Sequence, residues 1–169
     1  MFAKRIVEVF PNKSIAEIGC GVGQMVNQLN ILGADAKGFD VSDWAVEHAF
    51  CNKVSKGDVR SLPKDLADIV ICWNVVEYLE EQDINKALKS LRNSFKEYLL
   101  LRCIPVECWS DRGLIEAKEW GRNTFKPLEW WQCKYFENKL IPAEWMRYKF
   151  FDVLKGDEYM YPTFFIFKK

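Results

Sequence analysis

The stretch that decides the fold is Ser14-Ile15-Ala16-Glu17-Ile18-Gly19-Cys20-Gly21-Val22-Gly23. A short apolar strand here runs into a turn with three glycines, and residues 24–32 continue with apolar side chains at helical spacing. Because glycine has no side chain, a ligand can approach the backbone of such a turn closely. The sequence therefore predicts a strand, a glycine turn and a helix that together form a binding loop.

An acidic residue, Asp40, ends the next apolar run, which we expect to form a second strand over residues 36–40. A carboxylate at the tip of the neighbouring strand can accept hydrogen bonds from ribose hydroxyl groups. The glycine turn and Asp40 together predict a site for an adenosine-containing cofactor.

The composition is that of an ordinary soluble globular protein. The 169 residues are 49% hydrophobic and 28% charged, which suits one domain with a sizeable core. Lys plus Arg equals Asp plus Glu, 24 each, so no overall charge favours nucleic acid or an anionic membrane. No apolar run is long enough for a signal peptide or a membrane span, which predicts a cytoplasmic protein.

The six cysteines are scattered without any Cys-x-x-Cys pair. Cys20, Cys72 and Cys103 fall in or beside expected strands, where a thiol packs as a small apolar group. Because the spacing typical of metal ligands is absent, we expect reduced structural cysteines and no metal site.

Strands and helices alternate through the first part of the chain. We expect a helix over 43–51, a weak strand over 53–57, a buried strand over 67–73, a helix capped by Asp83 with Phe95 on its apolar stripe, and a strand over 98–104. This alternation indicates parallel crossovers and an α/β sheet covered on both faces. Later, helices are expected over 111–121 and 127–139, and a final antiparallel pair over 150–154 and 162–168 with a turn at 155–157.

The glycine spacing separates two kinds of cofactor. The oxidoreductase pattern is Gly-x-Gly-x-x-Gly, in which a helix N-terminus faces a pyrophosphate. Here the pattern is Gly-x-Gly-x-Gly, preceded by Glu17. A carboxylate at that position would repel a pyrophosphate but can pair with an ammonium group, so we expect S-adenosylmethionine. A nicotinamide-dependent oxidoreductase is the weaker alternative.

Four segments, residues 17–23, 38–42, 57–63 and 68–79, resemble in this order the successive motifs of the class I S-adenosylmethionine-dependent methyltransferases. Within this family, the chain resembles the small methyltransferases of the type 11-like group. The resemblance covers residues 14–104 and extends to the closing strands. It implies a Rossmann-like, doubly wound, mostly parallel seven-stranded sheet with an antiparallel last strand and helices on both faces. It also implies S-adenosyl-L-methionine as cofactor and S-adenosyl-L-homocysteine as product.

The resemblance assigns roles to the glycine turn. Gly19, Cys20, Gly21 and Gly23 would let the backbone pass beneath the methionine part and the ribose of the cofactor. Glu17 would lie near the cofactor's amino group.

Three further loops receive roles from the same resemblance. Asp40 would hold the ribose hydroxyls, and Val41 would pack on the adenine face. Asp58 with Val59 would accept a hydrogen bond from the adenine amino group, and Asn74 would line the pocket beneath the sulfonium.

Methyl transfer from a sulfonium depends mainly on holding the donor carbon and the acceptor atom close and in line. Many relatives carry Glu-His-Leu after the fourth strand, whereas residues 77–79 here read Glu-Tyr-Leu, and the only histidine, His48, lies in an expected helix. A general base is useful for a hydroxyl acceptor. By position alone the candidates, each more typical of a structural role, are Glu77, Tyr78, Asp111 and Glu129.

Loops after the fourth and fifth strands build the acceptor pocket in this architecture. We therefore expect a single domain over residues 1–169 in which an aromatic-rich insertion, about 109–147, lies on the acceptor side. Its aromatic faces suit a small planar or saccharide-like acceptor, and equally a plain hydrophobic lid. The excess of basic residues there is too small to indicate a groove that binds phosphates, so a nucleic-acid substrate is disfavoured.

Because the segment before the first strand is short, we expect a site that is either open or completed by a homodimer or another partner chain. The sequence thus favours a methyltransferase acting on a small molecule. The alternative is a non-catalytic S-adenosylmethionine-binding module or a partner-dependent subunit.

Overall fold

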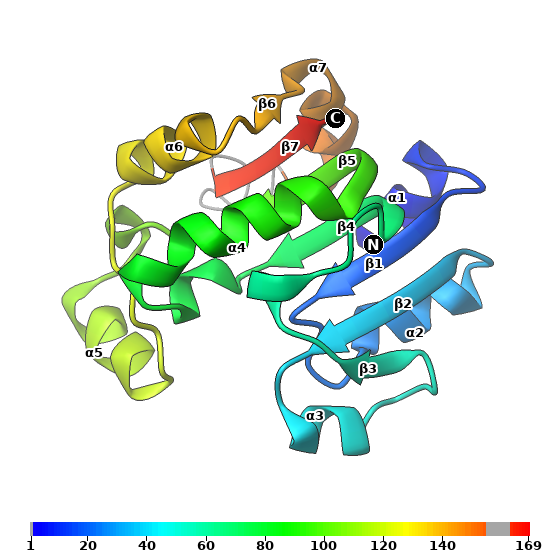
Figure 1. Ribbon diagram of the computed structural model, residues 1–169, viewed down its shortest axis with the longest axis horizontal. Helices are drawn as coiled ribbons and strands as arrows, with labels where there is room; N and C mark the ends of the chain where they lie inside the picture. The colour runs from blue at the N-terminus through cyan, green and yellow to red at the C-terminus, as the bar shows by residue number, and fades with distance from the viewer. Residues whose placement is uncertain (1, 155–162) are drawn as a thin grey trace.

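The computed structural model describes residues 2–154 and 163–169. One sheet of seven strands runs through the molecule in the order β3-β2-β1-β4-β5-β7-β6 (Figure 1). The strands are β1 (Ser14–Ile18), β2 (Asp35–Asp40), β3 (Val54–Lys56), β4 (Ala67–Trp73), β5 (Phe95–Arg102), β6 (Ile141–Pro142) and β7 (Phe164–Lys168).

The five neighbouring strands β3, β2, β1, β4 and β5 are parallel, and β7 pairs antiparallel with both β5 and β6. This confirms the predicted mostly parallel, doubly wound sheet with an antiparallel last strand. The strand order reverses at β1, which lies between β2 and β4. In open α/β sheets, ligands bind at the carboxyl ends of the strands at such a reversal.

Helices cover both faces of the sheet. They are α1 (Phe2–Val9), α2 (Gln24–Ile31), α3 (Asp43–Glu47), α4 (Glu81–Ser94), α5 (Asp111–Glu119), α6 (Leu128–Glu137), α7 (Glu144–Arg147) and α8 (Phe151–Leu154). Single 3₁₀ turns are η1 (Val59–Ser61), η2 (Val76–Tyr78), η3 (Val106–Cys108) and η4 (Tyr148–Phe150).

Two apolar clusters form the core, one on each face. In one cluster α4 and α6 pack on the sheet, through Leu88 and Trp131 among others. In the other, α1 and α2 pack with α7 and α8, for example through Ile6 and Leu29. Fully burying one such aliphatic side chain contributes roughly 1.5–3 kcal/mol, so the faces of these helices determine how they dock.

Three predicted helix boundaries are wrong. Asp83 does not cap α4, which begins at Glu81; its carboxylate pairs with Arg60 instead, at 2.8 Å. Phe95 is the first residue of β5 rather than a helical residue, because the chain passes from helix to strand without a loop. The predicted helix over 43–51 ends at Glu47, and Phe50 is 64% exposed.

The predicted strand over 150–154 is also wrong. Phe150 and Leu154 are both buried, and their separation of four residues is helical spacing, which places them in η4 and α8. The antiparallel partners of β7 are β5 and the two-residue β6, which the sequence did not indicate. The predicted turn at 155–157 lies outside the described residues.

None of the helices within residues 2–154 and 163–169 is long and apolar enough to cross a membrane. The six cysteines are free thiols; Cys72 and Cys103 are buried, and Cys133 is exposed. In the same described ranges, no group of three His, Cys, Asp or Glu side chains could hold a metal ion.

Candidate functional site

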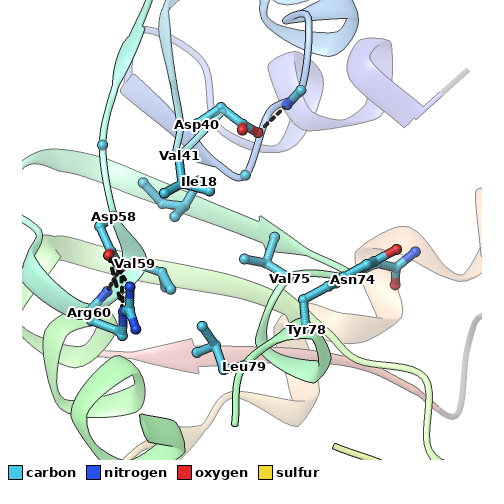
Figure 2. A pocket seen from close by; sticks show the side chains of 13 residues that line it. Ile18, Asp40, Val41, Asp58, Val59, Arg60, Asn74, Val75, Tyr78 and Leu79 are labelled. Carbon is cyan, nitrogen blue, oxygen red and sulfur yellow. Dashed lines mark hydrogen bonds and ion pairs between the residues drawn. The ribbon is translucent and has the colours of Figure 1, made fainter. Parts of the chain in front are cut away.

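A pocket of about 400 Å³ opens at the carboxyl ends of β1, β2 and β4, where the strand order reverses (Figure 2). Its lining comes from four segments that are far apart in the sequence. Seven of the residues given a cofactor role lie here: Gly19, Gly21, Asp40, Val41, Asp58, Val59 and Asn74. We refer to it as the main pocket.

The three glycines of the turn all have positive φ, but the atoms around them differ. A Cβ at Gly19 would lie 2.3 Å from Val75 Cγ2, and one at Gly23 would lie 2.4 Å from Val54 Cγ2. A Cβ at Gly21 would meet no atom within 4 Å. Gly19 and Gly23 therefore allow close packing within the protein, whereas Gly21 leaves bare backbone facing the pocket.

Asp40 holds this turn in place. Its Oδ2 accepts a hydrogen bond from the Gly21 N–H at 2.7 Å, and its Oδ1 accepts one from the Ser42 N–H at 2.9 Å (Figure 2). A carboxylate has about four lone-pair sites, so two further donors can still be accommodated. The arrangement fixes the backbone and leaves capacity for ligand hydroxyl groups.

Asp58 lines the pocket on the segment next to Asp40, since the Gly57 N–H donates to the Asp40 carbonyl at 2.9 Å. Its carboxylate is engaged by Arg60. The Arg60 Nη2 is 2.6 Å from Asp58 Oδ2, and Arg60 Nη1 is 2.8 Å from Asp83 Oδ2. The hydrogen bonds from the Arg60 side chain lower the pKa of Asp58. Asp58 is thus ionised and held firmly at the pocket, while Val59 beside it is buried.

Asn74 follows β4 directly and has a φ of 55°. Its N–H donates to the Arg102 carbonyl and its Oδ1 accepts from Arg102 Nη1, each at 2.9 Å. Asparagine tolerates this left-handed conformation better than most residues. The two bonds fix the chain where it turns into the pocket wall.

Glu17 and Cys20 line a separate cavity of about 410 Å³, beside α1 and the first turn of α2. Glu17 is 6% exposed, and its Oε2 has no hydrogen-bond partner. Burial raises the pKa of Glu17 to about 8, against a hydrogen bond with the Val26 backbone that lowers it; the Asp40 charge raises it further. Burial thus favours the protonated form of this carboxyl group at neutral pH, and a cation beside it would favour the charged form assumed from the sequence.

The four candidate bases have different surroundings. Glu77 is buried and pairs with Arg122, whereas Tyr78 is partly exposed and lines the main pocket. Asp111 lies in the first turn of α5, and Glu129 lies on α6 beside a different surface groove. Only Tyr78 therefore reaches the main pocket.

Further lining residues were not predicted: Ile18, Gly57, Arg60, Val75 and Leu79. All five lie within the four segments quoted from the sequence, so their positions could have been inferred from them. The pairing of Arg60 could not, because it depends on carboxylates on two different elements, Asp58 and Asp83.

Comparison with known proteins identifies the family and the fold. Residues 2–150 match the methyltransferase domain family. No curated protein sequence is significantly similar to the chain. Among solved structures, a SAM dependent methyltransferase from Archaeoglobus fulgidus has a TM-score of 0.71 at 17% identity, covering 99% of this chain and 91% of that one.

Two other solved structures are similar over most of the chain. The magnesium protoporphyrin IX methyltransferase of Synechocystis PCC 6803, with bound SAH, has a TM-score of 0.65 at 21% identity and covers 84% of this chain and 71% of that one. A putative methyltransferase of Haloferax volcanii, in complex with the Trm112 activator, has a TM-score of 0.64 at 18% identity, covering 83% and 68%. The chain therefore belongs to the methyltransferase domain family, with the fold of class I S-adenosylmethionine-dependent methyltransferases.

Proposed function

We propose that this protein transfers the methyl group of S-adenosylmethionine to a small planar or saccharide-like acceptor. The observation that carries the proposal is Gly21, which lines the main pocket and faces open space. A ligand can lie directly against this backbone, beside a carboxylate that has spare capacity for hydroxyl groups.

The residues of both cavities fit the cofactor. Asp40 would accept hydrogen bonds from the ribose, and the apolar Val41 and Val59 suit an adenine ring. The unpartnered, buried Oε2 of Glu17 suits the ammonium group at the other end. When bound, the cofactor supplies an electrophilic methyl group on its sulfonium.

The chain itself would contribute binding and orientation. Glu77 is engaged by Arg122 and is not free to act as a base, and Asp111 and Glu129 do not line the main pocket. We assign no base role to the remaining candidate, Tyr78, and propose an acceptor that is already nucleophilic, aligned with the methyl group by the site.

Calorimetry tests the cofactor assignment. We expect S-adenosylmethionine and S-adenosylhomocysteine to bind and NAD to give no heat. Asp40→Ala should weaken binding by about 1–3 kcal/mol, because ligand hydroxyls would lose their partner. Asp43→Ala is the matched control, since Asp43 makes an exposed pair with Lys56. Heat with NAD, or unchanged affinity in Asp40→Ala, would contradict the proposal.

A second reading is a cofactor-binding subunit that needs a partner chain for activity. It is favoured by α5, beside the site, where Ile115 and Trp120 are 62% and 63% exposed. One similar structure, the Haloferax methyltransferase, is a complex with an activator. Incubation of the purified protein with labelled methyl donor and the protein-free, small-molecule fraction of a cell extract separates the two readings. Tight cofactor binding without any labelled product would support the second.

A further inference from the structure

The chain between β5 and α6 leaves the body of the molecule and returns to it. The Val106 N–H donates to the Lys126 carbonyl at 3.0 Å, which closes the neck of an excursion over residues 106–126. Figure 1 shows that α5, which lies within it, projects from the rest of the fold. Of the residues of α5, only Ala117 is buried. The excursion is therefore held at its ends rather than by its helix.

The returning part of the excursion bonds to one short segment, residues 77–79. The N–H groups of Asn123 and Thr124 both donate to the Glu77 carbonyl at 3.0 Å. The Asn123 side chain donates to the Tyr78 carbonyl at 2.9 Å, and the Thr124 hydroxyl donates to the Leu79 carbonyl at 2.6 Å. Tyr78 and Leu79 line the main pocket. The excursion and the pocket wall are thus hydrogen-bonded to each other.

Arg122 lies at the centre of these contacts. Its Nη1 is 3.0 Å from Glu77 Oε1, and its side chain is 7% exposed. Its guanidinium lies 5.1 Å from the Tyr78 ring and 4.9 Å from the Trp109 ring. Trp109 belongs to the outgoing part of the excursion. One cation therefore joins both ends of the excursion to the pocket wall.

This arrangement is a costly way to gain stability. Arg122 Nε and Glu77 Oε2 are buried, and neither has a hydrogen-bond partner. When a charged pair is buried with unsatisfied polar atoms, the loss of hydration offsets much of the attraction between the charges. A protein with apolar side chains of similar volume at such positions is often as stable. Departures of this kind are expected at functional sites.

We propose that Arg122 is a positioning residue: through Glu77, Tyr78 and Trp109 it sets the Tyr78–Leu79 wall of the main pocket and couples that wall to the α5 excursion. The inference rests on the proposed function, because it assumes that the main pocket binds the adenosine part of the cofactor. Any movement of the excursion on the acceptor side would then alter cofactor affinity.

The probe for the test is 5′-methylthioadenosine, which lacks the amino acid end and so does not involve Glu17. Arg122→Met should weaken its binding about tenfold, and Arg122→Lys, which can keep the ion pair, should restore part of the affinity. Arg112→Met is the matched control, because Arg112 is an exposed α5 residue whose ion pair among the described residues, with Glu116, lies along its own helix. Thermal unfolding of each variant checks that it is folded.

A pH profile separates positioning from a merely structural role. Burial raises the pKa of Glu77 to about 6, although the charge of Arg122 opposes this. Affinity for the probe should fall as the pH drops from 7 to 5, and Glu77→Gln should bind weakly with no such dependence. The other groups facing Glu77 do not titrate there: Arg102 stays charged, and burial raises the pKa values of Cys72, Cys103 and Tyr135.

Equal affinity of Arg122→Met and the unchanged protein would overturn the positioning role, as would a pH profile that Glu77→Gln leaves unaltered. If the unchanged protein bound neither the probe nor S-adenosylhomocysteine, the proposed function itself would fail. The two failures are therefore distinguishable.

Discussion

Individual residues at the carboxyl edge of the sheet show how much of a site a sequence can specify. Four separate motifs predicted a common pocket, and the structure brings Gly21, Asp40, Asp58 and Asn74 around one cavity. This convergence was predictable because the carboxyl ends of parallel strands meet at one edge. Arg122 was not predictable, because its importance comes from partners that are distant in the sequence. The cofactor roles of these residues remain proposals.

Glu17 should make the stability of the ligand-free protein depend on pH. Its pKa is about 8 in the folded protein, above the value of 4.5 expected in the unfolded chain. Between these two pH values the Glu17 carboxyl group is therefore ionised in the unfolded state but protonated in the folded state. Above about pH 6, where Glu77 is ionised in the folded protein as well, the free energy of unfolding should fall by about 1.4 kcal/mol per pH unit up to about pH 8 and then level off. Urea denaturation at several pH values measures this. Glu17→Gln should remove this slope; an identical slope in that variant would refute the raised pKa.

The glycines of the turn should respond differently to alanine. Gly19→Ala combines a positive φ with a clash against Val75, and should lower the free energy of unfolding by roughly 2–5 kcal/mol. Gly21→Ala has the unfavourable φ alone, about 1–2 kcal/mol, yet should abolish binding of S-adenosylhomocysteine. Denaturation and calorimetry on both variants give the comparison. A Gly21→Ala protein that binds normally would exclude close approach of a ligand here.

At the scale of elements, periodicity predicted the long, regular ones and failed for the short ones. β4 and α2 were predicted nearly to the residue, because a buried apolar run and a helical stripe are distinctive. The segment Phe150-Phe151-Asp152-Val153-Leu154 fits either a strand or a helix, and only its packing on the sheet decides. β6 has two residues, one of them proline, which is too little pattern to detect.

Two aromatic residues of α6, Trp131 and Tyr135, belong to the core rather than to a cover over the pocket. Trp131 is fully buried, and Tyr135 packs against Phe165 and Phe167 of β7. Trp131→Ala should lower the free energy of unfolding by about 3–5 kcal/mol. Phe136→Ala, on the exposed side of the same helix at 84% exposure, should change it by less than about 0.5 kcal/mol. Chemical denaturation checks both values, and similar losses in the two variants would contradict this packing.

At the scale of the whole molecule, the alternation of strands and helices was enough to predict the sheet. The position of β7 between β5 and β6 depends on pairing between strands that are distant in the sequence. The sequence pattern predicts an antiparallel pair at the end of the chain but not which strands are paired. The family resemblance implied seven strands with an antiparallel last strand, but not this order.

The balanced charge of the chain predicts how its solubility varies. With 24 basic and 24 acidic residues and an isoelectric point near 6.6, repulsion between molecules should be weakest close to that pH. Light scattering between pH 5 and 9 should show the strongest attraction near pH 6.6. Monotonic behaviour across this range would indicate that exposed apolar side chains, not charge, govern association.

The hydrogen bond from Gly21 to Asp40 gives the protein a built-in reporter. An amide proton held by a carboxylate at 2.7 Å should exchange slowly with solvent and resonate far from ordinary glycine amides in a nuclear magnetic resonance spectrum. Hydroxyl groups arriving at the same carboxylate would share its electron density and shift that signal. Occupancy of the site could thus be followed, compound by compound, before any reaction product is known.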